Sequence, residues 1–307
     1  MDAITLAHEA VQVKLPPVKH KLEEPMSNHT SFKIGGPVRV MYFPEDLETL
    51  IGLGGILRDY GVAPLIIGNG TNLLVADGAL DRAVIKMTGL RCIRGTGGNE
   101  ITADAGAPLS SIATLAYELG LSGMEFAHGI PGALGGALVM NAGAYGREMK
   151  DVAHETIALN PDNALYSAVR DEHSFSYRSS RFSGTGDIIV SSTLRLQEGD
   201  KAGIKARMDE YARRRSESQP LDLPSAGSTF KRPEKGYAAM LIEEAGLKGF
   251  TVGGAQVSDL HSGFIVNRGG ATFSDVMAVI EHVKETVLKR SGIELRLEVK
   301  VVGRGVT

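Results

Sequence analysis

Two stretches of closely spaced glycines constrain this chain more than any other feature: GNGTN at residues 68–72 and GIPGALGGALVMNAGAYG at residues 129–146. Glycine makes up 38 of the 307 residues, well above the roughly 7% of an average protein. No Gly-X-Y period and no low-complexity tract accompanies these glycines, so they mark particular backbone conformations rather than disorder. Glycine permits left-handed dihedrals and close approach of a ligand, and consecutive N–H groups in such turns can bind phosphate.

The familiar glycine-rich nucleotide motifs are incomplete in both stretches. GNGTNL has Leu73 where the third glycine of the dinucleotide-binding G-x-G-x-x-G would lie, and no G-x-x-x-x-G-K-[ST] occurs. Ordinary tight turns between short strands are the alternative explanation of these glycines. Two such clusters favour a functional site, because loops carry function more often than the elements that they connect. We interpret them as a site where backbone amides hold a diphosphate in a domain without the Rossmann fold.

Composition and charge argue against several classes of protein. A net charge of −3 without a basic stripe makes nucleic acid an unexpected partner. The single cysteine, Cys92, excludes an internal disulfide and a multi-cysteine metal site, which fits a reducing cytoplasm. The eight histidines show no H-E-x-x-H and no pair at ligand spacing, so we expect no catalytic metal. We expect a cytoplasmic protein without a secretory signal or a membrane partner, because the N-terminus and the apolar runs match neither.

The spacing of apolar residues predicts an α+β chain with a larger N-terminal part and a C-terminal module. Helices are expected before the Pro16-Pro17 break and at residues 45–60, 108–119, 200–216, 236–245 and 273–290. Strands are expected at residues 38–43, 64–67, 73–75, 83–86, 100–103, 137–140, 152–159, 164–169, 188–196, around 252, at 263–266 and at 292–303. For the last helix, Thr272 and Asp275 suggest the N-terminal cap, and Val276, Ile280, Val283 and Val287 the buried face.

Seven blocks, in order along the chain, resemble the UDP-N-acetylenolpyruvoylglucosamine reductase family of peptidoglycan synthesis. They are NHTSFKIGG, IIGNGTNLLV, GIPGALGGALVMNAGAYG, SYRSSRF, PSAGSTFKRP, HSGFIVN and GIELRLEVKVVG. The resemblance implies a non-Rossmann FAD-binding fold of two subdomains, roughly residues 1–85 and 86–197. It also implies an α+β substrate-binding domain at residues 198–307, whose last strand returns to the active site.

The resemblance implies an FAD-dependent oxidoreductase that reduces UDP-N-acetylglucosamine enolpyruvate to UDP-N-acetylmuramate. FAD would be bound without a covalent link, and NADPH would donate the hydride that reaches the enol ether through FAD. Such a flavoprotein serves cell wall biogenesis, cell shape and cell division, and we expect it to be a cytoplasmic monomer. Two alternatives remain: a flavin-dependent oxidase of the same superfamily that uses dioxygen, and a nucleotide-sugar binding protein without turnover.

The family pattern places the FAD contacts in the two glycine-rich stretches. Together the two stretches would cradle the FAD diphosphate and lie along the flavin and its ribityl chain. The matching residues are Gly68, Asn69, Gly70, Thr71, Asn72, Gly129, Ile130, Pro131, Gly132, Gly135, Gly136, Asn141, Ala142 and Gly143.

The family pattern also assigns the chemistry to three residues that lie far apart in the sequence. Ser228 in AGSTF would donate a proton to the α-carbon of the substrate. Arg178 in SYRSSRF would pair with the substrate carboxylate, and Glu298 in RLEVK would lie near that carboxylate. Each has a simpler explanation: a turn serine, a surface salt bridge and a solvated strand face, respectively. AGSTF lacks the G-x-S-x-G pattern of a serine nucleophile, which agrees with a serine that acts as an acid.

Five further residues resemble substrate or flavin contacts of the family. They are Tyr145, Lys231, Arg232, His261 and Asn267. For His261 a purely structural role is the alternative. Ser218 stands where the pattern has a lysine before Gln-Pro, which puts one diphosphate contact in doubt. The short span between Arg178 and Ser228 resembles the subgroup without the extra loop that carries a substrate-covering tyrosine.

Overall fold

The computed structural model describes residues 1–15 and 18–303, and these residues divide into two compact units. The first unit comprises the described residues of 1–22, 39–69 and 82–214. The second comprises 23–38, 70–81 and the described residues from 215 onward. The sequence predicts an FAD-binding region at residues 1–197 and a substrate-binding domain at residues 198–307. The two compact units follow different bounds, because residues 23–38 and 70–81 belong to the second unit. The assignment of the two predicted ranges to FAD and to substrate stays a prediction. The expected Pro16-Pro17 break lies outside the described residues.

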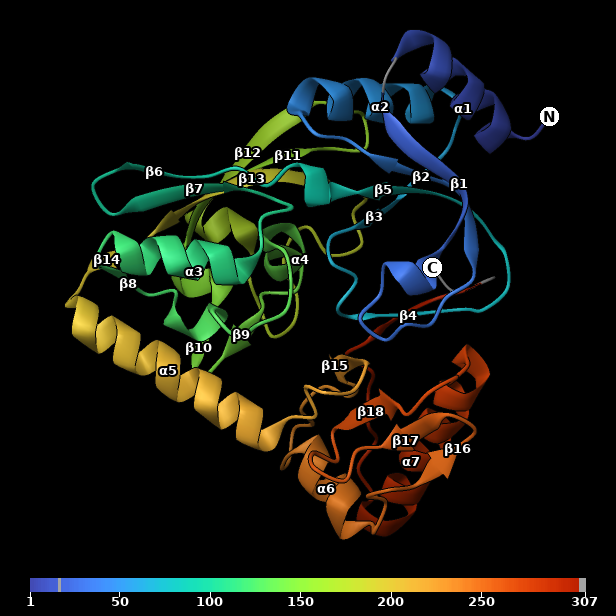
Figure 1. Ribbon diagram of the computed structural model, residues 1–307, viewed down its shortest axis with the longest axis vertical. Helices are drawn as coiled ribbons and strands as arrows, with labels where there is room; N and C mark the ends of the chain where they lie inside the picture. Colours follow the sequence, from blue (N-terminus) through green and yellow to red (C-terminus); the bar gives the residue numbers. More distant parts are fainter. Residues whose placement is uncertain (16–17, 304–307) are drawn as a thin grey trace. The chain divides into compact units, whose positions relative to one another are not determined.

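The centre of the first unit is a five-stranded antiparallel sheet in the order β12-β11-β13-β7-β6. Its strands are β6 (Ile93–Gly97), β7 (Glu100–Asp104), β11 (Ala153–Leu159), β12 (Leu165–Val169) and β13 (Ile188–Arg195). Helices α3 (Leu109–Glu118) and α4 (Leu134–Val139) pack against this sheet, and Figure 1 shows α3 running along β6 and β7. Ile101 of β7 lies opposite Leu194 of β13, and both are fully buried, so this pair belongs to the core between sheet and helices.

A second sheet has the order β1-β2-β5-β3, with β3 and β5 parallel. Its strands are β1 (Lys19–Pro25), β2 (Pro37–Phe43), β3 (Leu65–Ile67) and β5 (Leu80–Lys86). Helices α1 (Ala3–Lys14) and α2 (Leu47–Asp59) pack against each other and share one core with this sheet. Helix α2 begins after Asp46, whose carboxylate accepts the Thr49 N–H at 2.7 Å, as expected of an N-cap.

Short elements and one long helix complete the first unit. The short strands are β8 (Leu121–Ser122), β9 (Gly143–Ala144), β10 (Arg147–Glu148) and β14 (Gln197–Glu198). The 3-10 helices are η2 (Met87–Gly89), η3 (Glu125–Ala127), η4 (Met149–Asp151) and η5 (Arg170–His173). Helix α5 (Lys201–Ser218) follows β14, and its last residues belong to the second unit. No helix in the described part of the chain has both the length and the apolar character that a membrane span needs.

The second unit is an α+β module around a four-stranded sheet in the order β15-β18-β17-β16. Its strands are β15 (Ser225–Ser228), β16 (Thr251–Val252), β17 (Ala255–Val257) and β18 (Phe264–Asn267), and its helices are η1 (Met26–Asn28), α6 (Ala238–Glu244) and α7 (Phe273–Ser291). The closing strand β19 (Lys300–Val302) pairs in parallel with β4 (Leu73–Val75), directly after the first glycine stretch. Helix α7 has the predicted reciprocal cap between Thr272 and Asp275, and it buries one apolar face as expected.

Two of the expected strands are wrong. Residues 137–140 belong largely to α4, in which Leu134, Ala137 and Leu138 are buried at helical spacing. A short apolar run does not distinguish a buried strand from a buried helix, which explains the error. The expected strand at 292–303 is regular only in β19, because the segment before it makes a single bridge, between Leu297 and Phe230.

Candidate cofactor and substrate sites

The start of the first glycine stretch meets the second stretch in the first unit. A Cβ atom built on Gly68 would lie 3.0 Å from the Cβ of Ala133, so a side chain at position 68 would push the two turns apart. The second stretch is hydrogen-bonded to the turn at 105–109, where the Gly135 N–H donates to the Ala105 carbonyl at 2.8 Å. The turns that follow β3 and β7 and the turn that precedes α4 therefore lie side by side.

The second glycine stretch presents bare backbone at its surface. Gly129, Pro131 and Gly136 are exposed, and a Cβ atom on Gly136 would have no other atom within 4 Å. Surfaces without side chains allow a ligand to reach main-chain N–H groups. Such turns fit a dinucleotide cofactor such as FAD that is held by the backbone without a covalent link.

Asn141 connects the second glycine stretch to the loop that carries Arg178. Its side chain is fully buried, and its Nδ2 donates to Glu148 Oε2 at 3.0 Å and to the Ser176 carbonyl at 3.1 Å. Its Oδ1 accepts the Lys150 N–H at 3.0 Å. Because all of these contacts are internal, Asn141 holds the two segments together, and a direct contact of its side chain with FAD stays a prediction.

Arg178 lies in a strained turn. The N–H and carbonyl groups of Ser176 and Ser179 exchange hydrogen bonds of 3.0 and 3.3 Å, and Arg178 between them has a φ of +55°. Such a left-handed non-glycine residue costs on the order of 1 kcal/mol or more, and it is typical of functional loops. The guanidinium lies over the ring of Tyr177, 5.2 Å from its centroid, and the residue is half-buried.

Tyr145 forms the tip of the β9–β10 hairpin. Tyr145 and Gly146 have φ values of +54° and +81°, the left-handed pair of a two-residue hairpin turn. The ring stacks on Tyr211 of α5 with centroids 4.1 Å apart, and its hydroxyl donates to the Tyr211 carbonyl at 2.8 Å. The hairpin tip is therefore attached to α5, and the predicted contact of Tyr145 with a ligand stays a prediction.

Ser228 and Glu298 are brought together in the second unit. Ser228 ends β15 just after Gly227, which has a φ of +75°, at a register shift in the pairing with β18. The next residue, Thr229, accepts the Glu298 N–H at its carbonyl at 2.9 Å. The segments around Ser228 and Glu298 are therefore paired side by side. Arg178 belongs to the first unit, and its convergence with this pair stays a prediction.

Asn72 attaches the first glycine stretch to the same closing segment. Its Nδ2 donates to the Glu298 carbonyl at 3.2 Å, and its own carbonyl accepts the Lys300 N–H at 2.9 Å. Gly70, two residues before Asn72, lies very close to His29. A Cβ atom built on Gly70 would lie 2.1 Å from the His29 carbonyl oxygen. Glycine is required there, since its φ is also +63°.

The predicted substrate-binding residues of the second unit differ in how many hydrogen bonds their side chains make within the protein. Asn267 is buried, donates to the Phe32 carbonyl at 3.1 Å and accepts the N–H groups of Gly269 and Ala271 at 2.9 and 3.1 Å. Its amide therefore shapes the turn that follows β18. His261 Nδ1 accepts the Gly263 N–H at 3.2 Å.

Burial lowers the pKa of His261, so its imidazole is neutral near pH 7.

Lys231 and Arg232 follow Phe230 in the same segment as Ser228. The Arg232 guanidinium lies 4.2 Å from the ring centroid of Tyr237, while Arg232 itself is exposed. Ser218, where a lysine was expected, is the last residue of α5.

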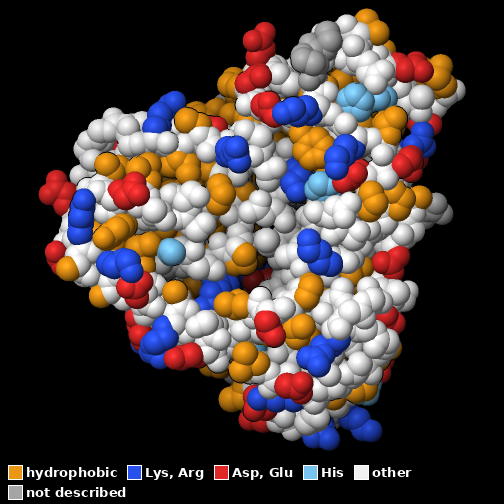
Figure 2. Space-filling model, viewed as in Figure 1, with side chains coloured by type: hydrophobic (Ala, Val, Ile, Leu, Met, Phe, Trp, Pro, Cys, Tyr) orange, Lys and Arg blue, Asp and Glu red, His pale blue; other side chains and the backbone are white. Residues whose placement is uncertain are grey.

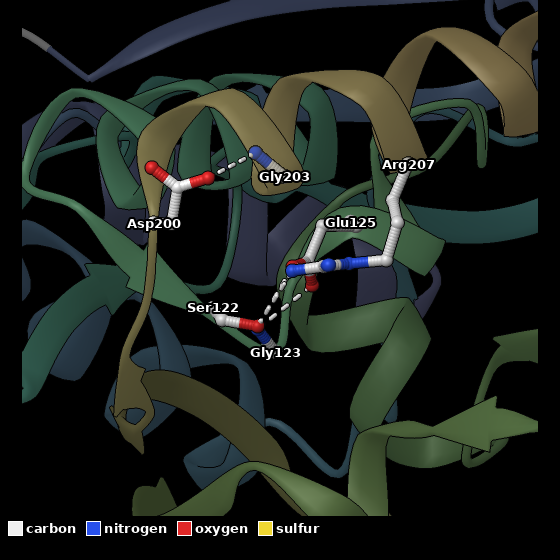
Figure 3. Close-up of polar contacts among 6 residues, drawn as sticks. All are labelled: Ser122, Gly123, Glu125, Asp200, Gly203 and Arg207. Atoms are coloured by element: carbon white, nitrogen blue, oxygen red, sulfur yellow. Dashed lines mark hydrogen bonds and ion pairs between the residues drawn. The ribbon is translucent and has the colours of Figure 1, made fainter.

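An ion pair between the buried Glu125 and the exposed Arg207, not predicted from the sequence, attaches α5 to the segment around η3. Glu125 Oε1 accepts Arg207 Nη2 at 2.7 Å and the Ser122 hydroxyl at 2.8 Å, and Oε2 accepts the Gly123 N–H at 2.7 Å (Figure 3). At the start of the same helix, Asp200 caps the Gly203 N–H at 2.8 Å.

Burial alone would raise the pKa of Glu125, but the hydrogen bonds from Arg207, Ser122 and the Gly123 N–H outweigh it and lower the pKa. The Ser-x-x-Glu spacing from Ser122 to Glu125 is the sequence signal that could have indicated an internally bonded glutamate. Nothing local in the sequence of α5 distinguishes Arg207 from its charged neighbours.

Comparison with known proteins identifies the family. A family model for the C-terminal domain of UDP-N-acetylenolpyruvoylglucosamine reductase matches residues 219–302, and one for an FAD binding domain matches residues 38–165. The reductase of Caldanaerobacter subterraneus subsp. tengcongensis is 49% identical over 92% of this chain and 93% of its own length. The chain belongs to this family. The reductase of Syntrophomonas wolfei is 46% identical over 94% of this chain and 97% of its own length.

A solved structure agrees with the sequence comparisons. The crystal structure of UDP-N-acetylenolpyruvylglucosamine reductase from Thermus caldophilus has a TM-score of 0.79 and 34% identity, over 93% of this chain and 98% of that chain. The predicted family, the α+β fold with an FAD-binding and a C-terminal domain, and the FAD cofactor are confirmed. The individual site residues stay predictions.

Proposed function

We propose that this chain reduces UDP-N-acetylglucosamine enolpyruvate to UDP-N-acetylmuramate, with NADPH as hydride donor and FAD as the bound carrier. The activity is that of its reductase family, and it belongs to peptidoglycan synthesis. The observation that carries the proposal at the level of residues is the pairing of the segments that hold Ser228 and Glu298.

The turns of the first unit would hold the cofactor. Gly136 leaves backbone open where a diphosphate or a flavin needs close approach, and Gly68 and Gly135 let the turns around it pack closely together. Asn141 would keep the second stretch and the Arg178 loop in register around the flavin. When bound, FAD supplies hydride transfer from NADPH to the β-carbon of the enol ether.

Ser228 would donate the proton that completes the reduction. Addition of hydride to the β-carbon moves negative charge onto the α-carbon and the carboxylate of the substrate. The hydroxyl of Ser228 would protonate the α-carbon, and such a proton donor typically contributes about 10²- to 10⁴-fold to a rate. The position of Ser228 after a left-handed glycine and at a register shift is one that regular strand pairing would not give.

Arg178 and Glu298 would position the substrate carboxylate. The planar guanidinium of Arg178 suits a two-point contact with a carboxylate and stays charged through the reaction. Glu298 would lie beside the same group and orient it toward Ser228. The strained conformation of Arg178 supports this role, since backbone strain is retained mainly where function needs it.

The nucleotide part of the substrate would meet two cations near Ser228, the half-buried Lys231 and the exposed Arg232. Lys231 and Arg232 would contact phosphates of the UDP group or of NADPH, and Tyr237 holds the Arg232 guanidinium in place. Because the Nδ1 of the neutral His261 accepts the Gly263 N–H, its Nε2 carries the hydrogen and can donate a hydrogen bond to a sugar hydroxyl. Asn267 would act indirectly, through the turn that its amide shapes.

We also propose that the protein works as a cytoplasmic monomer that binds neither nucleic acid nor membranes. Lysine, arginine, aspartate and glutamate side chains are interspersed over the face shown in Figure 2, which supports a surface without a nucleic-acid stripe. Sedimentation at several protein concentrations tests the monomer directly. A constant mass of one chain is expected, and a mass that rises with concentration would contradict it.

An oxygen-free assay tests the activity itself. NADPH consumption should match, one for one, the formation of a product two hydrogen atoms heavier than the enolpyruvyl substrate, as measured by mass spectrometry. A flavin oxidase would instead consume dioxygen and form hydrogen peroxide with an alcohol or sugar. NADPH that is not consumed without oxygen, together with peroxide formed in air, would overturn the proposal in favour of the oxidase.

A further inference from the structure

Two histidines from different elements direct one ring nitrogen each toward the same side chain. His8 lies on α1 and His20 in β1, with ring centroids 4.7 Å apart. Gln12 Nε2 lies 3.1 Å from His8 Nε2 and 3.3 Å from His20 Nε2. An amide nitrogen only donates hydrogen bonds, so both ring nitrogens are acceptors, and their lone pairs point to one place.

The other ring nitrogen of each histidine faces an oxygen atom. His20 Nδ1 lies 3.1 Å from the Val18 carbonyl, which only accepts, so this nitrogen carries the hydrogen. His8 Nδ1 lies 3.0 Å from the hydroxyl of Tyr42, a fully buried side chain of β2. In this hydrogen-bond arrangement each imidazole donates from Nδ1 and keeps a lone pair at Nε2. Metal-binding histidines have this arrangement, in which a second oxygen partner fixes the tautomer and the ring orientation.

The surroundings of His8 favour the neutral form of its imidazole, which is the form that binds a metal. Burial lowers the pKa of His8, and the nearby His20 lowers it further, while Glu9 opposes both effects. Gln12 is exposed and His20 is half-buried, so an ion could reach the two nitrogens from solvent when the Gln12 side chain rotates aside. Rotation of its amide also brings an oxygen ligand to the place that the nitrogen now occupies.

We propose that His8 and His20 bind one divalent transition-metal ion, Zn²⁺ or Cu²⁺, through their Nε2 atoms. Imidazole nitrogens suit both ions, and the Gln12 side-chain oxygen and water would fill the remaining positions. No group of three or more His, Cys, Asp or Glu side chains able to hold a metal lies within residues 1–15 and 18–303, so this is a two-histidine site of modest affinity. The ion would fasten α1 to β1, and it takes no part in the proposed reduction.

Metal titration of the full-length, FAD-loaded protein tests this site. Calorimetry with Zn²⁺, and with Cu²⁺ separately, should show one saturable ion per chain and a higher thermal midpoint with metal. His20→Gln should weaken binding at least tenfold, because one of the two nitrogen ligands is lost. The glutamine can still donate to the Val18 carbonyl, and unchanged flavin absorbance and circular dichroism would show that the variant is folded.

His282→Gln is the matched control. His282 lies on α7 and stacks on Phe250 with centroids 4.0 Å apart, so its loss should leave metal affinity unchanged. For Cu²⁺, electron paramagnetic resonance should show coupling to two imidazole nitrogens in the wild type and to one in His20→Gln. The proposal is overturned by non-saturable binding, by equal affinity in the wild type and His20→Gln, or by an equal loss of affinity in the control.

Discussion

In the first unit the candidate cofactor site is formed by main-chain atoms, whereas in the second unit the candidate catalytic groups are side chains. Around Gly68 and Gly135, turns pack so closely that an added Cβ atom would meet its neighbour at 3.0 Å. Around Ser228 and Glu298, ordinary backbone pairing carries the functional groups.

The two sites therefore tolerate different substitutions. A main-chain site is damaged by adding atoms, because a Cβ changes the path of the backbone and the room for the cofactor. A side-chain site is damaged by removing atoms, while its backbone stays paired. Variants of the first kind should lose FAD and stability together, and variants of the second kind should lose chemistry alone.

Ser228→Ala should have the largest effect, on chemistry alone. Loss of the proton donor should lower turnover about 10²- to 10⁴-fold, equivalent to about 3–5 kcal/mol in the barrier. Reduction of the flavin by NADPH should stay near normal, as measured by rapid mixing. Ser291→Ala is the matched control, because the Ser291 hydroxyl donates to the Val287 carbonyl at the end of α7. Unchanged turnover in Ser228→Ala would remove it from the reaction.

Gly70→Ala should have the next largest effect, on stability and cofactor together. The new Cβ would lie 2.1 Å from the His29 carbonyl oxygen, at a φ of +63°. The free energy of unfolding should fall by about 3 kcal/mol, and the purified protein should contain less FAD. Gly78→Ala adds its Cβ where no other atom lies within 4 Å, so denaturant unfolding should show little change. Equal stability of the two variants would contradict a requirement for glycine at position 70.

Arg178→Lys should lower turnover about 10- to 100-fold, since a point charge replaces a planar fork at the substrate carboxylate. The fold and the FAD content should be preserved. Arg181→Lys, three residues along the same loop, is the control, because Arg181 lies over the Tyr166 ring and donates to the Glu172 carbonyl. If steady-state kinetics changed equally in both variants, Arg178 would have no special role.

Glu125→Gln should have the smallest effect, about 1–2 kcal/mol at neutral pH, on stability rather than chemistry. The pKa of Glu125 in the folded protein lies below its ordinary value of 4.5. Its carboxylate therefore stabilises the fold above that pH, and the contribution is lost as the pH falls through the lowered pKa.

Denaturant unfolding across this pH range should show the wild type and Glu125→Gln converging in acid. Glu210→Gln is the control on the same helix, because Glu210 pairs with Arg213 and Arg214 at the surface. A difference between wild type and Glu125→Gln that persisted in acid would show that the charge of Glu125 is not its cause.

Much of the fold could be predicted because its signals are local. The cap of α7 needs only Thr272 and Asp275, three residues apart, and the structure has the predicted reciprocal hydrogen bonds. Glycine likewise predicts the turns at Gly70 and Gly146, where the backbone has a positive φ.

The missed features depend on partners that are distant in the sequence. The contact of Glu298 with Thr229 and the burial of Glu125 under Arg207 arise only once the chain has folded. Helix α4 was missed for a different reason, because its apolar run is too short to show a period. The roles of Ser228, Arg178 and Glu298 came from the family resemblance, since no local pattern distinguishes them from a turn serine or a surface ion pair.

The most direct test of the account is an absorbance spectrum of the purified protein, taken in three steps without oxygen. The account predicts flavin absorbance at first, its loss after NADPH is added, and its return when the enolpyruvyl nucleotide sugar is added. A colourless protein that binds the nucleotide sugar would contradict it. So would a flavin that NADPH reduces but that only dioxygen restores.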